Sequence, residues 1–284
     1  MLSSDGLNFS DGPAFNRTAG LLASIESTLR AAGLPRADVL ALSLTGVRGQ
    51  VPDPSTVGER CNELIGATSV ALVDDGYACL VGALSGSDGV AISVGSGVVA
   101  VAQHNQRVAH RDGDGPVLGD DGGGFWIGRE GLRAAIRAYE DRGPQTQLLE
   151  DIQVEYGSVY SAIRVKSDEE IMRWCLEVAP LVLKAASAGD AIALEIRTSA
   201  IKLLTETLTS TWRAVGEVNQ EIFASYTGGV MKDSEFRNEF QKISKMKLPN
   251  ISWREPIGDN TDGAMTIARS QSVNLQPLLR WWHT

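Results

Sequence analysis

The sequence contains few of the residues that build disulfide frameworks and metal sites. It has three cysteines and three histidines among 284 residues. Cys61, Cys79 and Cys175 are too scattered for a disulfide framework or a Cys-x-x-Cys metal motif. A reducing compartment is therefore expected, and we predict a cytoplasmic protein without a metal site built from its own side chains.

Long apolar runs and basic clusters are also missing. No run approaches the roughly 18 apolar residues that a membrane-spanning helix needs, and the N-terminal residues do not resemble a signal peptide. The net charge is −9, whereas nucleic-acid binding requires a basic surface that displaces counterions. We therefore expect neither a membrane nor a nucleic-acid partner. Hydrophobic residues make up 43% of the chain, which is typical of a globular protein.

Short apolar strands alternate with helices along the chain. Residues 39–44 and 70–73 have the composition of buried strands, and residues 77–84 that of a helix packed on them. A long helix is expected over residues 190–218, before another strand at 222–225. Alternation of this kind predicts parallel strands joined by crossover helices, and the length favours two lobes. The sequence thus predicts an α/β protein.

Carboxylates and glycines occur where the predicted strands end, and open α/β sheets bind ligands at such ends. Asp75 follows a strand directly, so it is a candidate to accept the proton of a reacting hydroxyl. Capping of the next helix by Asp74 and Asp75 explains the same pair. The turn Gly95-Ser96-Gly97 joins two strands. It either brings backbone N–H groups to a phosphate or is an ordinary hairpin turn.

Two further glycine-rich segments follow. Residues 119–124 read Gly-Asp-Asp-Gly-Gly-Gly, and carboxylates reached through such a close backbone suit sugar hydroxyls. Residues 227–229, Thr-Gly-Gly, either hold a nucleotide at a helix N-terminus or form a tight turn. His104, His110 and His283 lack metal-ligand spacing, so we expect them to be surface or capping residues.

The order of these motifs resembles a known family. The segments G-V-A-I-S-V-G-S-G, G-D-G-P-V-L-G-D-D-G-G-G-F-W-I-G and T-G-G-V are similar to those of the N-acetylglucosamine kinases, within the BadF/BadG/BcrA/BcrD ATPases. The resemblance runs from about Gly12 to Ala268. It implies the ribonuclease-H-like, actin-like ATPase fold: two lobes with mixed central sheets flanked by helices, and ATP and Mg²⁺ in the cleft. We expect residues 1–100 to form one lobe and 101–284 the other.

The resemblance also implies roles for single residues. Asp75 corresponds to the catalytic aspartate, which contacts the sugar 6-hydroxyl and takes its proton. The implied sugar-binding residues are Asn16, Asp75, Gly113, Gly115 and Asp120. The implied ATP-binding residues are Gly95, Ser96, Gly97, Gly228, Gly229 and Asp233. Three positions depart from the family pattern, because Ser96 replaces threonine, Val98 replaces serine and Asp114 replaces tryptophan.

The implied reaction is transfer of the ATP γ-phosphoryl group to a hydroxyl of an amino sugar, such as N-acetylglucosamine or glucosamine. The family's first phosphate-binding hairpin precedes the region of resemblance, so we expect a truncated first lobe and weak ATP binding. The expected partners are a small-molecule sugar and a nucleotide, with a homodimer left open. Two alternatives remain: a non-catalytic sugar- or nucleotide-binding regulator, and a dehydratase-activating ATPase with an iron–sulfur cluster held by cysteines.

Overall fold

The computed structural model describes residues 14–34, 36–160, 167–271 and 275–284. The strands are β1 (Val39–Leu44), β2 (Ser69–Asp74), β3 (Gly89–Val94), β4 (Val98–His104), β5 (Arg107–Asp112), β6 (Ile222–Thr227), β7 (Ile251–Trp253) and β8 (Leu279–His283). The helices are α1 (Ala14–Ala31), α2 (Ser55–Ile65), α3 (Asp75–Leu84), α4 (Gly124–Tyr139), α5 (Gln147–Tyr156), α7 (Asp168–Ser187), α8 (Ala191–Arg213), α9 (Ser234–Lys247) and α10 (Asn260–Ser270), with the 3-10 helix η1 (Val230–Lys232).

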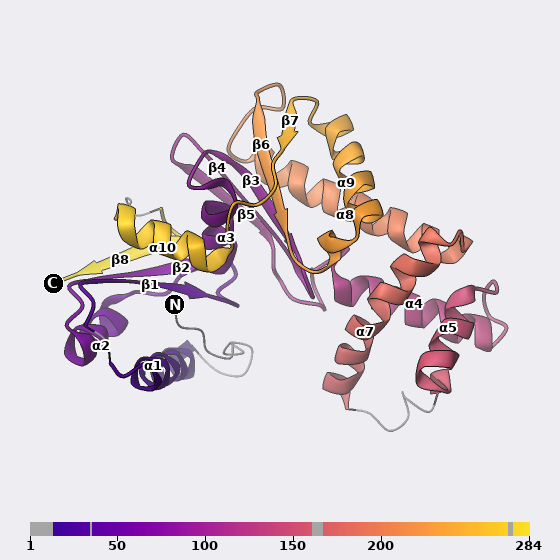
Figure 1. Ribbon diagram of the computed structural model, residues 1–284, viewed down its shortest axis with the longest axis horizontal. Helices are drawn as coiled ribbons and strands as arrows, with labels where there is room; N and C mark the ends of the chain where they lie inside the picture. The colour runs from indigo at the N-terminus through magenta and orange to yellow at the C-terminus, as the bar shows by residue number, and fades with distance from the viewer. Residues whose placement is uncertain (1–13, 35, 161–166, 272–274) are drawn as a thin grey trace.

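These strands form two mixed sheets (Figure 1). The first sheet has the order β1-β2-β8, with β1 and β2 parallel and β8 antiparallel to β2. The second has the order β5-β4-β3-β6-β7. Strands β3, β6 and β7 are parallel to one another, and β4 is antiparallel to both of its neighbours, β3 and β5. Each sheet therefore contains parallel strands, and within each sheet the carboxyl ends of these strands lie at the same edge, where ligands usually bind.

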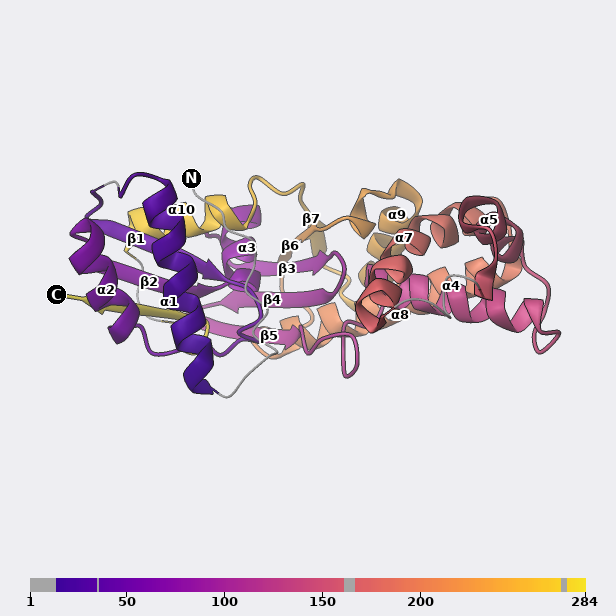
Figure 2. The same ribbon diagram turned by 90° about the horizontal axis from the view of Figure 1, so that it is seen from below.

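Helices and sheets alternate in layers (Figures 1 and 2). Apolar residues of α1 and α2 cover one face of the first sheet. Helices α3 and α10 pack between the two sheets, where their side chains share a core with residues of β2, β3, β4 and β8. The largest core begins on the other face of the second sheet, beneath α8 and α9, and extends into the arm that α4, α5 and α7 form. Burial on both faces explains why the middle of β2, residues 70–73, is entirely apolar.

The two central helices approach each other unusually closely. A Cβ atom on Gly82 of α3 would lie 1.9 Å from the carbonyl oxygen of Asp259. A Cβ atom on Gly263 of α10 would lie 1.8 Å from the carbonyl oxygen of Ala78. Because real atoms do not come so close, only glycine fits at these two positions. The contact fixes α3, and with it the start of the helix at Asp75, between the sheets.

Sheet membership does not follow a single cut in the sequence. Strand β3 starts at Gly89, before the expected boundary at residue 100, and already belongs to the second sheet. The C-terminal elements α10 and β8 return to the first sheet.

The expected strands at 39–44 and 70–73 agree with β1 and β2. In contrast, β5, α2, β7 and β8 had no counterpart in the predicted elements. None of the described helices is long and apolar enough to cross a bilayer.

Candidate active site

The carboxylates of Asp74 and Asp75 have different environments. Asp74 ends β2, is 1% exposed, and caps α3, because its Oδ1 accepts a hydrogen bond of 3.1 Å from the backbone N–H of Tyr77. Its Oδ2 accepts a second bond, of 3.0 Å, from the N–H of Gly49. Capping of α3 therefore explains Asp74, whereas the carboxylate of Asp75 has other partners.

Asp75 lies beside Thr45 because of the sheet register. Leu44 of β1 pairs with Asp74 of β2, so the residues that follow these two strands emerge side by side. The Thr45 hydroxyl donates a hydrogen bond of 2.5 Å to Oδ2 of Asp75. Burial raises the pKa of the Asp75 carboxyl, the negative charge of Asp74 adds to this, and the bond from Thr45 acts in the opposite direction. A carboxyl of this kind is suited to exchange a proton with a bound hydroxyl.

A cavity of about 200 Å³ adjoins Asp75, between the two sheets. Its lining combines the start of α3 with the carboxyl ends of β3 and β6, where Ser93 pairs with Thr227. The thiol of Cys79 lies 3.2 Å from the Thr227 hydroxyl on the same wall. Asp75 and the strand ends of the opposite sheet thus line the same cavity.

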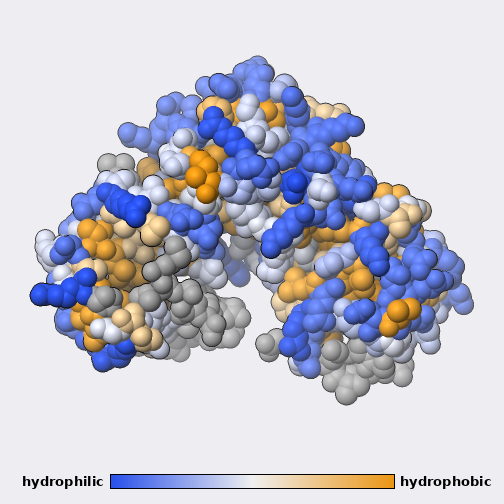
Figure 3. Space-filling view, in the orientation of Figure 1, coloured by the Kyte–Doolittle hydropathy of each residue, from blue (hydrophilic) through white to orange (hydrophobic). Residues whose placement is uncertain are grey.

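A larger cavity, of about 630 Å³, lies on the other side of these strand ends. The turn after β3 contributes Gly95 and Ser96, and the segment after β6 contributes Gly229, Val230 and Asp233. Helix α7 supplies an apolar wall formed by Leu176, Ala179, Pro180 and Leu183. In Figure 3 a hollow separates two arms of the molecule, and apolar side chains gather on the arm that carries α4 and α7. An apolar wall facing a glycine turn suits a ligand with a flat apolar part and a phosphate part.

Glycine is required where the two turns meet. Gly228 has φ +97°, and a Cβ atom there would lie 2.3 Å from the carbonyl oxygen of Val94. The turn after β6 can therefore pack directly on the turn after β3. Asp233 lies in the wall of the larger cavity and also caps α9, because its side chain accepts a hydrogen bond of 2.9 Å from the N–H of Phe236.

Asp120 lies against the turn that contains Ser96. Its Oδ1 accepts a hydrogen bond of 2.9 Å from the N–H of Val98, and a Cβ atom on Gly97 would lie 2.5 Å from that oxygen. The N–H of Asp120 in turn donates a 2.7 Å bond to Oδ1 of Asp112, at the end of β5. Burial raises the pKa of both carboxyls. The aspartate of the glycine-rich segment is therefore bonded to the predicted phosphate turn.

Gly113 and Gly115 follow β5 and have φ values of +76° and +87°. A Cβ atom on Gly115 would lie 3.6 Å from the guanidinium group of Arg48, in the loop after β1. The Arg48 charge lowers the pKa of Asp120, against the larger effect of burial. The loop between β5 and α4 thus meets residues of the first sheet, although the sequence separation is large.

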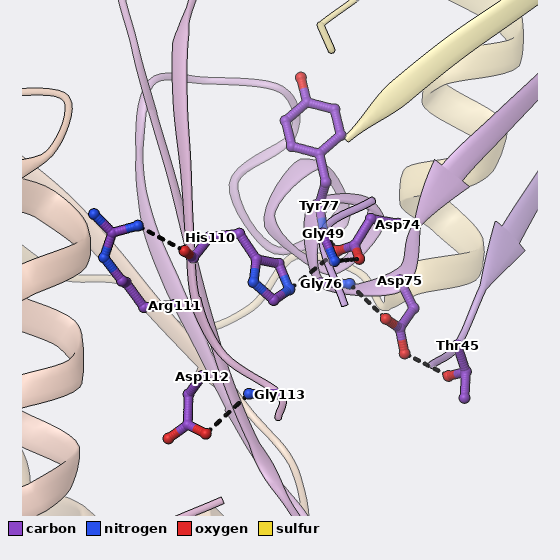
Figure 4. A network of polar contacts seen from close by, with 10 residues as sticks. All are labelled: Thr45, Gly49, Asp74, Asp75, Gly76, Tyr77, His110, Arg111, Asp112 and Gly113. Carbon is purple, nitrogen blue, oxygen red and sulfur yellow. Dashed lines mark hydrogen bonds and ion pairs between the residues drawn. The ribbon is translucent and has the colours of Figure 1, made fainter. Parts of the chain in front are cut away.

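The structure assigns His110 a different environment from the one expected. Its imidazole side chain is 13% exposed, and Nε2 lies 3.7 Å from Oδ1 of the buried Asp74 (Figure 4). The contact between His110 and Asp74 was not evident from the sequence, because β5 was not predicted and a lone histidine carries no spacing signal. Thr45 was recognisable only as the residue that ends a strand. Asn16 belongs to α1, and its side chain falls outside the described residues.

Cysteine and metal chemistry find little support in the described parts of the chain. Cys61, Cys79 and Cys175 are buried, unpaired, and carried by α2, α3 and α7 respectively. Within the described ranges no group of three or more His, Cys, Asp or Glu side chains could hold a metal ion. The iron–sulfur alternative therefore gains no support from the arrangement of the cysteines.

Comparisons with known proteins agree with the motifs. The N-acetylmuramic acid/N-acetylglucosamine kinase of Clostridium acetobutylicum is 24% identical over 231 residues, covering 77% of this chain and 73% of that protein. The N-acetyl-D-glucosamine kinase of Dictyostelium discoideum is 25% identical, covering 81% and 73%. The crystal structure of a putative N-acetylglucosamine kinase from Chromobacterium violaceum superimposes with a TM-score of 0.64 at 23% identity, covering 89% of this chain and 85% of that one.

These likenesses confirm the predicted actin-like ATPase fold. The model of the BadF/BadG/BcrA/BcrD ATPase family matches residues 12–265, nearly the range over which the glycine-rich motifs suggested the resemblance. That range includes the turns after β3 and β6 at the larger cavity, and the carboxylates of Asp75 and Asp120. The chain belongs to the BadF/BadG/BcrA/BcrD ATPase family.

Proposed function

We propose that this protein is an ATP-dependent kinase that phosphorylates a hydroxyl of an amino sugar, such as N-acetylglucosamine or glucosamine. The observation that carries the proposal is the half-buried Asp75, held by Thr45 and facing a cavity at the ends of β3 and β6. Phosphorylation of a hydroxyl uses a carboxylate placed beside the acceptor, and the position of Asp75 in the wall of this cavity meets that requirement. The names of the curated relatives agree with this substrate class.

The nucleotide would occupy the larger cavity. Membership of an ATPase family implies ATP, and the apolar wall of α7 offers a surface for adenine. Ser96 and the neighbouring glycines would contact the phosphates, and Gly228, Gly229 and Asp233 the adenosine. Mg²⁺ in such sites is held mainly by phosphate oxygens and water, which fits the lack of a three-ligand cluster among the described residues. When bound, the ion would neutralise charge on the transferring phosphoryl group.

Asp75 would orient the acceptor hydroxyl and take its proton as phosphoryl transfer proceeds. The Thr45 hydroxyl donates to Oδ2 of Asp75 and the backbone N–H of Gly76 donates to Oδ1 at 3.0 Å, so both bonds restrict the rotation of this carboxylate. Each oxygen keeps a further lone pair with which it could accept a hydrogen bond from the acceptor hydroxyl. Gly113, Gly115, Asn16 and Asp120 would bind the remaining sugar hydroxyls. Because the cavity at Asp75 is small, a bound sugar would displace its water and limit hydrolysis of ATP.

A coupled assay tests the proposal. Purified protein is mixed with Mg-ATP and a panel of sugars that includes N-acetylglucosamine, N-acetylmuramic acid, glucosamine, glucose and N-acetylmannosamine, and ADP release and sugar phosphate are both measured. We expect stoichiometric sugar phosphate with at least one amino sugar. Binding of sugar and ATP without any turnover would instead support the regulator alternative. A homodimer and a cytoplasmic location stay predictions.

The Asp120→Asn variant tests sugar binding separately. We expect sugar affinity to fall by about 1–3 kcal/mol, the usual cost of a mispaired buried acceptor, with kcat at saturating sugar changed far less. The asparagine carbonyl can still accept the bond from Val98, so the melting temperature should stay close to that of the wild type. Calorimetric titration with the best sugar of the panel gives the affinity. Unchanged affinity would assign Asp120 to the support of the turn alone.

A further inference from the structure

His110 is the point at which the second sheet contacts the carboxylate pair of the first. It lies on β5, and its Nε2 faces Oδ1 of Asp74 at 3.7 Å. The same carboxylate already accepts hydrogen bonds from Gly49 and Tyr77, so three separate segments meet on one buried group. The ring nitrogen thus adds a third polar neighbour to the buried carboxylate of Asp74.

The imidazole occupies a closely fitted slot. A Cβ atom on Gly49 would lie 3.0 Å from Cγ of His110, and one on Gly113 would lie 3.3 Å from its Cε1. Both glycines have positive φ, +68° and +76°, so side chains are unfavourable there for two reasons. Loops from both sheets therefore leave room for this ring and hold it in place.

His110 lies between the segments that carry the two proposed substrate-binding carboxylates, Asp75 and Asp120, and Figure 4 shows it with Asp74, Asp75 and Asp112. Toward the first sheet, Asp74 directly precedes Asp75 and fixes the start of α3. Toward the second, Asp112 is two residues beyond His110 on β5 and accepts bonds from the N–H groups of Gly113 and Asp120. The series Asp75–Asp74–His110–Asp112–Asp120 thus joins the two sides of the site.

We propose that His110 is a positioning residue that, through Asp74, sets the Asp75 carboxylate relative to the sugar-binding loop. It touches no reacting atom itself. Four segments pack at the ring, and their other charged residues are Asp75 at the start of α3, Arg48 beside Gly49, Arg111 and Asp112 on β5, and Asp114 beside Gly113. The guanidinium of Arg111 donates a hydrogen bond to the backbone carbonyl oxygen of His110, not to its imidazole ring.

Two substitutions separate positioning from packing. His110→Phe keeps a ring of similar size without the donor, and His110→Gln keeps an N–H near the place of Nε2. We expect kcat to fall about tenfold or more in His110→Phe and to stay within about threefold of the wild type in His110→Gln, with both KM values little changed. In an Asp75→Asn background, His110→Phe should cost almost nothing more, because the two residues act as one unit.

His104→Phe is the matched control. His104 also lies in the second sheet and faces a carboxylate, with Nδ1 3.3 Å from Asp88, but it contacts no part of the proposed site. We expect its kcat to equal that of the wild type. Equal rates for the wild type and His110→Phe, equally slow His110→Phe and His110→Gln, or additive losses with Asp75→Asn would each overturn the proposal.

The kcat measurements rest on the proposed function, so a second experiment uses a property that does not depend on enzymatic activity. Amide hydrogen exchange of Gly49 and Tyr77, the two donors to Asp74, is followed by NMR in each variant. We expect exchange to be about tenfold faster in His110→Phe, and unchanged in His110→Gln and His104→Phe. If the wild type phosphorylates no sugar, the proposed function fails, and unchanged exchange in His110→Phe would then overturn the positioning contact as well.

Discussion

Asp75→Asn is expected to lower kcat for sugar phosphorylation by about 10²-fold or more, the usual size of a general-base effect. Asparagine fills the same volume and can still accept the hydrogen bond from Thr45, but it has no basic oxygen for the hydroxyl proton. Sugar and ATP affinities should change little, because the loss arises in the transition state. Steady-state kinetics with calorimetric titrations of both ligands separate these effects. Turnover like that of the wild type would remove Asp75 from the catalytic role.

The same residue predicts a pH dependence of the rate. The base must be ionised to act, and burial raises the pKa of Asp75 above that of an ordinary aspartate. The rate should therefore decline on acidification at a higher pH than an exposed aspartate would give, and stay constant above that range until another group titrates. Asp75→Asn should lack this acid limb. A wild-type profile flat down to the range of an exposed aspartate would contradict the assignment.

Gly263→Ala is expected to lower the free energy of unfolding by about 3 kcal/mol, near the upper end of ordinary overpacking costs. The new methyl group would occupy the position 1.8 Å from the carbonyl oxygen of Ala78, so α10 and α3 would have to separate. A backbone carbonyl in a helix gives way less readily than a side-chain tip. Urea unfolding followed by circular dichroism measures the change.

Gly20→Ala is the matched control for this substitution. Gly20 also lies in a helix, α1, but its Cβ position has no other atom within 4 Å. Alanine there should be neutral or should stabilise the protein by up to about 1 kcal/mol, because of its higher helix propensity. Equal stability of the two variants would show that the central helices do not need their close contact.

Local patterns in the sequence were enough to predict the family and several core elements, among them β1, β2 and α3. Strands β1 and β2 are mostly apolar, and the turn after β6 carries Gly228, which the close approach of the Val94 backbone requires. Such features depend on neighbours within a few residues, so they are visible without a structure. Strands β5 and β8 were missed, since β5 is polar at most positions and the short β8 becomes a strand by pairing with β2.

The environment of each carboxylate was decided only by the tertiary structure. Asp74 and Asp75 are adjacent and chemically identical, yet one caps a helix while the other faces a cavity, because the pairing of β1 with β2 brings Thr45 to Asp75 alone. His110 meets Asp74 because β5 and β2, in different sheets, are brought together across the α3–α10 layer. Residues far apart in sequence come together only when helices and sheets pack, and periodicity and local propensity carry no record of such contacts.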